Sequence, residues 1–123
     1  MERKKILLVD DSNTILMMEK MILNKSNYTM VTASNGEEAV TKAESEKPDL
    51  ILMDVIMPKM DGFEACRRIR LSAATSTIPI IMVTTRGEEL NVETGYQAGC
   101  TDYVTKPINS TELMSKLRNY LGE

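Results

Sequence analysis

The sequence predicts a doubly wound α/β fold in which helices cover both faces of a five-stranded parallel sheet. Short continuous apolar runs, the pattern of strands buried on both faces, alternate five times with longer segments of helical periodicity. This alternation is typical of parallel strands joined by right-handed crossovers. Ligand sites in such folds lie just beyond the carboxyl ends of the strands. Polar residues at those positions are therefore the first candidates for function.

The size and composition of the chain suit one globular domain. Its 123 residues are 42% hydrophobic and 27% charged, and we expect a single domain over residues 1–123 with no output domain. The net charge of −3 argues against nucleic acid as a direct partner. No apolar run approaches the roughly 20 residues that span a bilayer, and no signal peptide is recognisable. We expect a cytoplasmic protein without membrane insertion, and we assume a monomer.

Two residue types restrict the chemistry. Histidine is absent, which excludes histidine bases, histidine triads and zinc sites of the histidine type. Any phosphohistidine must therefore come from a partner. The two cysteines, Cys66 and Cys100, are far apart and form no CxxC pattern, so we predict buried, reduced thiols.

The first elements are predicted from short patterns. Ile6–Val9 and Met30–Ala33 are apolar runs typical of strands. Between them, Ser12 or Asn13 can cap a helix that extends to about Lys25. Apolar residues cover more than one side of this helix, and the excess is either additional core or a docking surface for a partner. We expect the inner stripe of this helix to consist of Ile15, Met18 and Ile22.

The middle of the chain contains the strand around which the other elements are arranged. A second helix precedes it, for which Ser34 and Asn35 both have capping-box spacing. Leu50–Asp54 is the third predicted strand, in which four apolar residues run directly into a carboxylate. The chain then turns at Pro58 and continues as a helix that Asp61 can cap.

The last elements follow the same pattern. Ile80–Val83 is the fourth predicted strand. Glu88–Ala98 is a weak helix, because its apolar spacing is irregular and Gly95 costs about 1 kcal/mol relative to alanine. Tyr103–Thr105 is a short fifth strand, and Asn109 can cap the last helix. The inward residues of that helix are predicted to be Leu113, Leu117, Tyr120 and Leu121.

Five polar residues follow the predicted strands and should meet at one edge of the sheet. Asp10 and Asp11 follow the first strand, Asp54 ends the third, Thr84 follows the fourth and Lys106 follows the fifth. Three neighbouring carboxylates repel one another, so a cation is needed to make the arrangement favourable. Mg²⁺ suits such oxygen ligands. Lys106 can pair with Asp54 or with a phosphoryl oxygen.

These residues also carry a resemblance to a known family. The sequence resembles the receiver domain of bacterial two-component response regulators from Ile6 to Leu121, most of all its stand-alone type as found in chemotaxis. The resemblance implies a flavodoxin-like three-layer sandwich with strand order 2-1-3-4-5. The matching motifs are Asp10-Asp11, Asp54 with Met57-Pro58 and Met60-Asp61-Gly62, Thr84, and Tyr103-Val104-Thr105-Lys106-Pro107.

The resemblance implies a role for each residue at the sheet edge. Asp54 would accept a phosphoryl group from a phosphohistidine on a sensor histidine kinase or a histidine phosphotransfer protein. Asp11, Asp54 and the backbone carbonyl of Ile56 would bind Mg²⁺ directly, and Asp10 would act through a metal-bound water. Lys106 would hold a phosphoryl oxygen. Such transfers depend mainly on positioning and charge neutralisation.

The resemblance also implies a conformational switch that controls a downstream protein target. After phosphorylation, the hydroxyl of Thr84 would move toward the phosphoryl group, and Tyr103 would turn inward. The face formed by the fourth helix, fifth strand and fifth helix would change as a result. Pro58 and Gly62 would have structural roles, and the peptide bond before Pro107 would be cis.

Three positions differ from the commonest family pattern. Thr85 replaces a smaller residue, which would narrow access to the phosphorylation site. Ile56 cannot hydrogen-bond a water that attacks the aspartyl phosphate, and Arg86 stands where fast-cycling chemotaxis regulators have a carboxylate or an amide. We therefore expect a phosphoaspartate with a longer lifetime than in those proteins.

Three other functions would use a similar site or a similar fold. Phosphohydrolases with an aspartate nucleophile use a similar site, but they usually carry a second aspartate at the position of Ile56. A degenerate receiver could act as an interaction module without phosphorylation, but such domains normally lack one of the site residues. A flavin-binding protein would need a hydroxyl- or glycine-rich phosphate loop, where this chain has Asp10 and Asp11.

Overall fold

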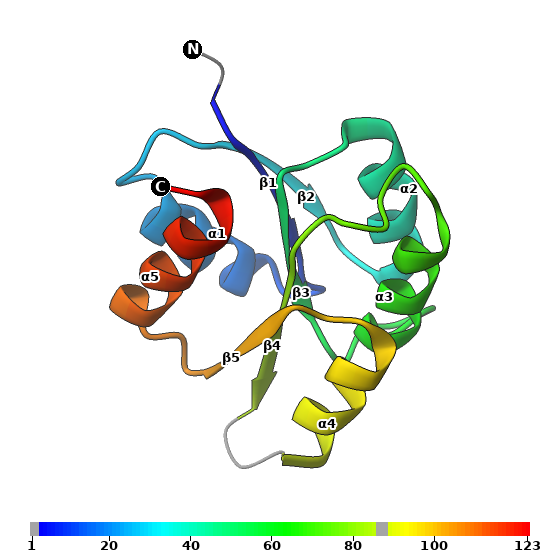
Figure 1. The fold of residues 1–123 in the computed structure, drawn as a ribbon. Coiled ribbons are helices and arrows are strands. Elements are labelled where there is room, and N and C mark those ends of the chain that lie inside the picture. The colour runs from blue at the N-terminus through cyan, green and yellow to red at the C-terminus, as the bar shows by residue number, and fades with distance from the viewer. Residues whose placement is uncertain (1–2, 86–88) are drawn as a thin grey trace.

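The fold is a five-stranded parallel sheet with the strand order β2-β1-β3-β4-β5, as expected (Figure 1). The computed structural model describes residues 3–85 and 89–123, without the side chains of residues 85 and 89–91. The elements are β1 (Lys5–Val9), α1 (Asn13–Leu23), β2 (Thr29–Ala33), α2 (Gly36–Glu46), β3 (Leu50–Asp54), α3 (Gly62–Leu71), β4 (Ile80–Thr85), α4 (Glu89–Ala98), β5 (Asp102–Lys106) and α5 (Ser110–Leu121).

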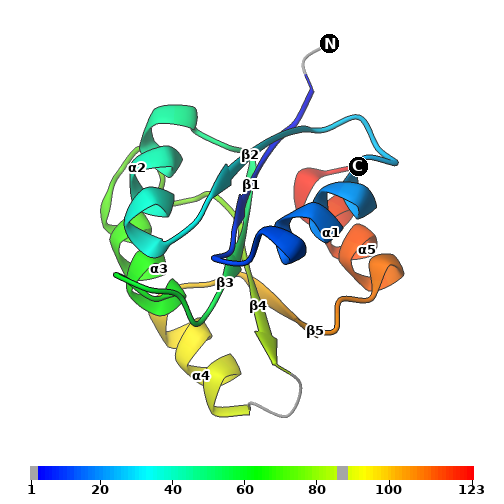
Figure 2. The same ribbon diagram turned by 180° about the vertical axis from the view of Figure 1, so that it is seen from behind.

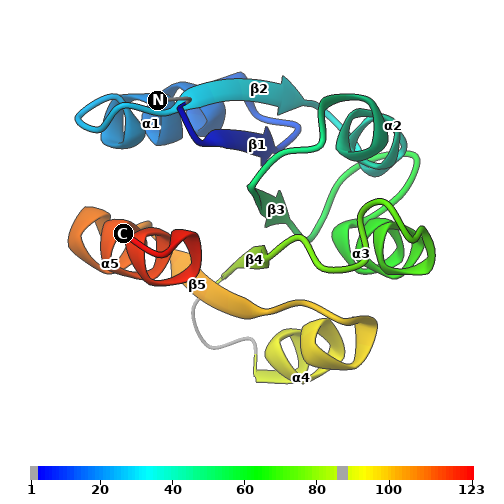
Figure 3. The same ribbon diagram turned by 45° about the horizontal axis from the view of Figure 1, so that its top comes forward.

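The helices form two layers around the sheet. Helices α1 and α5 cover one face, and α2, α3 and α4 cover the other (Figures 1 and 3). The view from behind shows the carboxyl ends of the strands at one edge and both chain termini at the opposite edge (Figure 2). None of the helices in the described part of the chain has the length and apolar character of a membrane span.

Alternation along the strands produces two separate cores. Ile6 and Leu8 of β1 belong to the cluster beneath α1 and α5, whereas Leu7 and Val9 belong to the cluster beneath α2, α3 and α4. All four side chains are buried because each face of the sheet is covered. Successive side chains of a strand therefore pack alternately against the two helical layers.

The predicted helix starts are confirmed by the hydrogen bonds of the capping residues. Ser12, Asn35, Asp61 and Asn109 each accept a hydrogen bond from the backbone N–H three residues later. Asn35 rather than Ser34 is the cap of α2. These caps supply partners for backbone groups that a helix leaves unpaired.

The predicted inner stripe of α1 is wrong. The buried residues are Leu16, Glu19 and Leu23, whereas Met18 is 40% exposed. The observed stripe is displaced from the predicted one by one residue, which is about 100° around a helix. Because α1 is apolar on several sides, its sequence pattern did not select the face that packs on the sheet.

Helix α4 and the two cysteines lie on the face of the sheet that α1 and α5 do not cover. Helix α4 begins at Glu89, one residue after the predicted start at Glu88, which lies outside the described residues. Cys66 and Cys100 are both buried and free, as predicted.

Gly62 is required by a close backbone approach at the end of β3. A Cβ atom at this position would lie 2.1 Å from the carbonyl oxygen of Asp54. The N–H of Gly62 also donates a hydrogen bond of 2.8 Å to the carbonyl of Val55. The glycine therefore lets α3 start directly against the loop that follows Asp54.

We expect Gly62→Ala to lower the free energy of unfolding by about 3 kcal/mol or more, since backbone atoms would have to move. Gly122→Ala is the control, because its Cβ meets nothing within 4 Å and only its φ of 75° is unfavourable. That variant should lose about 1 kcal/mol. Urea denaturation of both variants measures the difference, and equal losses would contradict the steric explanation.

Candidate functional site

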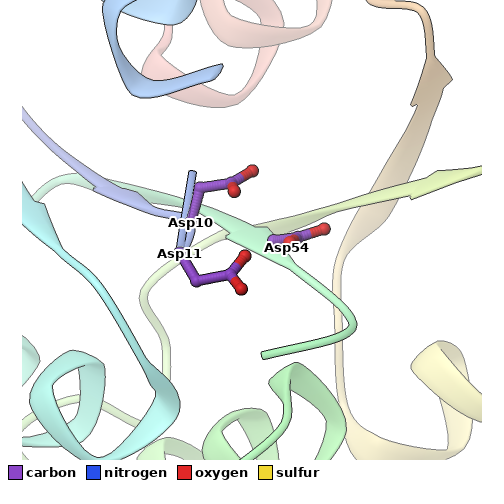
Figure 4. A group of neighbouring side chains, drawn as sticks. All are labelled: Asp10, Asp11 and Asp54. Atoms are coloured by element: carbon purple, nitrogen blue, oxygen red, sulfur yellow. The ribbon is translucent and has the colours of Figure 1, made fainter. Parts of the chain in front are cut away.

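Three carboxylates meet at the carboxyl ends of two adjacent strands. Asp10 and Asp11 follow β1, and Asp54 is the last residue of β3. Each can place an oxygen within 4.8 Å of oxygens from the other two, and no other such acidic group exists within the described residues. The three side chains extend toward the same side of the strand ends (Figure 4). The predicted acidic cluster is therefore assembled by the pairing of β1 with β3.

The next two strands complete the site. Thr84 of β4 and Lys106 of β5 line a cavity of about 230 Å³ together with the three aspartates. The Nζ atom of Lys106 donates a hydrogen bond of 3.0 Å to Oδ1 of Asp54 and lies 3.6 Å from Oδ2 of Asp10. Strand β4 lies between β3 and β5, so the long lysine side chain reaches across one strand to Asp54.

The carboxylates differ in burial and in hydrogen bonding. Asp10 and Asp54 are 1% and 6% exposed, whereas Asp11 is exposed. Asp54 Oδ1 accepts from the N–H of Val55, and Asp10 Oδ1 accepts from the N–H of Ser12. Asp10 Oδ2 is buried and has no hydrogen-bond partner. The site therefore contains an unsatisfied acceptor.

Burial, hydrogen bonds and neighbouring charges alter the pKa values of two residues at the site. Burial raises the pKa of Asp10 despite the hydrogen bond from Ser12, and the negative charge of Asp54 raises it further. Burial alone would lower the pKa of Lys106, but the hydrogen bond and charge of Asp54 raise it above its ordinary value. Lys106 is therefore a permanent cation at neutral pH, while Asp10 lies in a negative environment that a further cation would relieve.

The residues present fit a divalent cation such as Mg²⁺. The donors are hard carboxylate oxygens, which Mg²⁺ prefers. One of them, Asp10 Oδ2, is buried without a partner, and a buried acceptor of this kind is costly unless a proton or a cation satisfies it. Lys106 supplies only one positive charge against three carboxylates.

The loop after β3 forms the rim of the cavity. Ile56 lines the cavity and is 76% exposed. Beyond it, Lys59 has a φ of 68°, and the N–H of Met60 donates to the carbonyl of Pro58 over 2.7 Å. Of the two other positions at which the sequence departs from the family pattern, Arg86 lies outside the described residues, as does the side chain of Thr85.

Four of the predicted residues do not line the cavity, namely Pro58, Gly62, Tyr103 and Pro107. The half-buried ring of Tyr103 packs against the core beneath α2, α3 and α4 and does not line the cavity. The Lys106–Pro107 peptide bond is cis, as the resemblance implied.

Glu19 is a buried acidic residue that the sequence analysis missed. It lies on α1, is 1% exposed, and its Oε1 atom has no hydrogen-bond partner. Burial raises its pKa to about 8, and the negative charge of Asp10 contributes. The spacing of three and four residues between Leu16, Glu19 and Leu23 was the available signal. A single glutamate in a helix is usually solvated, so the sequence favours another face of α1 as the buried one.

The fold and the site together define a class of protein. It is a doubly wound α/β domain with an acidic cavity and a lysine at the carboxyl edge of its sheet. The chain belongs to the response regulator receiver domain family, which matches residues 6–118.

Two individual proteins are similar in sequence to nearly the whole of this chain. The chain is 43% identical over 118 residues to the alkaline phosphatase synthesis transcriptional regulatory protein PhoP of Bacillus subtilis. It is 39% identical over 118 residues to protein PilH of Pseudomonas aeruginosa. Both alignments cover 96% of this chain, but they cover 48% of PhoP and 98% of PilH. The chain thus spans about half the length of PhoP and nearly all of PilH.

A solved structure with a bound metal is also similar. It is the receiver domain of the sensor histidine kinase PA1611 of Pseudomonas aeruginosa, with a magnesium ion coordinated in the active site cleft. The TM-score is 0.91 at 33% sequence identity, and the match covers 99% of this chain and 100% of that chain.

We expect the buried carboxyl of Glu19 to make stability depend on pH. In the unfolded chain Glu19 ionises near its ordinary pKa of 4.5, but in the folded chain it keeps its proton until about pH 8. Its contribution to stability is therefore complete below pH 4.5 and declines as the pH rises toward 8. Between pH 5 and pH 8, the free energy of unfolding should therefore fall by about 2–4 kcal/mol less in Glu19→Gln than in the wild type.

Urea denaturation of wild type and variant from pH 5 to pH 8 measures this difference. Glu44→Gln, which removes the same charge from an exposed position of α2, should leave the pH dependence unchanged. Because a buried glutamine amide introduces its own cost, Glu19→Leu is a second variant that should show the same loss of pH dependence. Parallel pH profiles for all four proteins would contradict the assignment.

Proposed function

We propose that the chain is a phosphorylation-dependent signalling switch in which Asp54 accepts the phosphoryl group. The observation that carries the proposal is the contact between Lys106 Nζ and Asp54 Oδ1 inside a cavity that Asp10 and Asp11 also line. A nucleophilic carboxylate, a cation beside it and two further carboxylates for a metal are the components that phosphoryl transfer to an aspartate needs.

In the proposed reaction, a carboxylate oxygen of Asp54 attacks the phosphorus of a partner's phosphohistidine. A P–O bond forms as the P–N bond breaks, and the imidazole leaves with the electron pair and takes up a proton from solvent. Lys106, already bonded to Asp54, exchanges part of that contact for a phosphoryl oxygen. Thr84 lines the same cavity and can donate its hydroxyl hydrogen to another phosphoryl oxygen.

Asp11, Asp54 and the backbone carbonyl of Ile56 would hold Mg²⁺ directly, and Asp10 would contribute through a water. When bound, Mg²⁺ would neutralise charge on the transferring phosphoryl group. All four residues line the cavity, and the magnesium ion in the receiver domain of PA1611 supports the assignment. The burial of Asp10 and the exposure of Asp11 agree with an indirect role for the former and an accessible one for the latter.

The proposed donor is a sensor histidine kinase or a histidine phosphotransfer protein, because the chain itself has no histidine. The proposed output is a change in the α4-β5-α5 face. Thr84 and Tyr103 would respond to the phosphoryl group, and a downstream protein target would bind the changed face. A single receiver domain without an output domain stays a prediction, because relatives of both lengths match. The cytoplasmic location and the monomeric state also stay predictions.

The alternative functions have less support. A phosphohydrolase of the aspartate type would need an acid or base at the position of Ile56, which is an exposed apolar residue at the rim. A degenerate receiver would lack part of the site, but the five residues at the strand ends all line one cavity.

Incubation with acetyl phosphate and Mg²⁺, followed by intact-mass measurement, tests the proposal. We expect the wild type to gain one phosphoryl group and to lose this capacity when EDTA removes the metal. Asp54→Asn should abolish the gain because the nucleophilic oxygen is replaced by an amide. Asp61→Asn is the matched control, since asparagine can still cap α3, and it should be phosphorylated like the wild type.

If acetyl phosphate gives no product, beryllofluoride with Mg²⁺ replaces it as a probe that needs no covalent transfer. Changes in the amide spectrum of wild type, absent in Asp54→Asn, would still support the proposal. A wild type that responds to neither reagent would refute it.

The lifetime of the phosphorylated chain should depend on Ile56. Its side chain is exposed at the rim and cannot hydrogen-bond an attacking water. We expect Ile56→Asn, which provides an amide at that position, to accelerate loss of the phosphoryl group several-fold. Leu71→Asn makes the same replacement at an exposed position on α3 and should not change the rate. A rapid loss from wild type that Ile56→Asn leaves unchanged would show that the lifetime is set elsewhere.

A further inference from the structure

A second polar cluster lies at the opposite end of β5 from Lys106. Asp102, the first residue of β5, accepts hydrogen bonds from the Tyr120 hydroxyl at 2.7 Å, from Lys116 Nζ at 3.2 Å and from the N–H of Tyr103 at 2.7 Å. The hydroxyl of Tyr96 lies 3.5 Å from the same carboxylate. We call these five residues the Asp102 cluster. One carboxylate thus connects α4, β5 and α5.

Lys116 contacts Tyr103 in two ways. Its Nζ atom donates a hydrogen bond to the backbone carbonyl of Tyr103 and lies 5.1 Å from the centroid of the tyrosine ring. A cation at this distance from an aromatic ring is attracted by its π electrons. Tyr96 contacts the same ring edge-to-face, with centroids 6.3 Å apart and an interplanar angle of 87°. The ring of Tyr103 is therefore held by side chains from both flanking helices.

The ionisation states keep these contacts in place at neutral pH. Burial would raise the pKa of Asp102, but the hydrogen bonds from Tyr120, Tyr103 and Lys116 lower it overall. The hydrogen bond to Asp102 raises the pKa of Tyr120 to about 12. Asp102 is thus a carboxylate, and Tyr120 stays a hydrogen-bond donor.

The cluster and the acidic cavity share one strand. Tyr103 and Lys106 both belong to β5 and are three positions apart, which is about 10 Å along a strand. Lys106 is bonded to Asp54 at one end, and Asp102 is bonded to both helices at the other. The two sets of contacts are therefore attached to the same short strand.

We propose that Asp102 and Lys116 are positioning residues that restrain Tyr103 in the arrangement seen here and so oppose the change that a phosphoryl group at Asp54 promotes. This inference rests on the proposed function. If the Tyr103 ring rotates inward, it loses its contacts with Lys116 and Tyr96. The phosphoryl group on Asp54 would favour this rotation, and the contacts would oppose it. Contacts made in only one of two states bias the equilibrium toward that state.

The restraint has a measurable consequence at the acidic cavity. Coupling between two sites is reciprocal. The factor by which a bound phosphoryl mimic disfavours the present position of Tyr103 is therefore also the factor by which the contacts of Tyr103 weaken binding of the mimic. Loss of one cation–π contact or of its supporting carboxylate should therefore tighten binding about three- to tenfold. A purely structural role predicts the opposite, because damage to β5 would displace Lys106 and weaken binding.

The experiment is a titration of the full chain with beryllofluoride in the presence of Mg²⁺, followed by amide NMR. The variants are Lys116→Met, which keeps the stem of the side chain and removes its charge, and Asp102→Asn. Lys25→Met is the matched control, because it removes one exposed positive charge beyond the end of α1. Circular dichroism establishes that each variant is folded, and Lys116→Met carries the test if Asp102→Asn is not.

We expect tighter binding by Lys116→Met and Asp102→Asn and unchanged binding by Lys25→Met. The double variant should match the single variants, because both remove the same restraint. Equal or weaker binding by both variants, with normal binding by wild type, would overturn this inference alone. A wild type that neither binds the mimic nor gains a phosphoryl group from acetyl phosphate would overturn the proposed function and this inference with it.

Discussion

The mutual repulsion of three carboxylates at the end of β1 and β3 is the constraint on which the site depends. Asp10, Asp11 and Asp54 are brought within reach of one another by strand pairing, and the hydrophobic core beneath the two strands supplies the free energy that opposes their repulsion. Lys106 compensates part of the charge. The remaining negative charge favours a cation at this site, which the proposed phosphoryl chemistry would use.

The sheet positions the residues of the cavity, and its strand β5 also carries contacts with two helices. Strands β3, β4 and β5 each supply at least one residue to the cavity, and the segment directly after β1 supplies Asp10 and Asp11. The strand registers fix how these residues face one another. Strand β5 is special because it carries Lys106 at one end and the Asp102 cluster at the other. Lys106 and the contacts with α4 and α5 thus belong to one five-residue strand.

Several features of the structure favour function over maximal stability. Asp10 and Glu19 each bury a carboxylate oxygen without a hydrogen-bond partner, which destabilises the fold unless a proton or cation is present. Helix α4, with Gly95 in its interior, has a weakly helical sequence. Natural domains concentrate such unfavourable elements at sites that bind ligands or change shape. Asp10 lines the acidic cavity, Glu19 on α1 is close enough to Asp10 for their charges to interact, and α4 belongs to the face that we propose to change.

Much of the fold could be predicted from local signals. The apolar runs that end in Asp54 and Thr84 indicate buried parallel strands, and the capping residues Ser12, Asp61 and Asn109 mark where helices begin. The convergence of Asp10, Asp54 and Lys106 also follows from sequence, because parallel strands bring their carboxyl ends to one edge. The strand order itself came from the family resemblance, since several orders satisfy the same alternation.

Other features depended on contacts between residues far apart in the chain. Helix α1 is apolar on several sides, so only its packing on the sheet decided that Glu19 is buried and Met18 is not. Asp102, Lys116 and Tyr120 carry no local signal that they bond to one another. The sequence by itself determined which elements form and which polar residues end the strands, because those properties depend on neighbours along the chain. The tertiary structure decided which helix faces are covered and which side chains meet, because burial and charge pairing depend on neighbours in space.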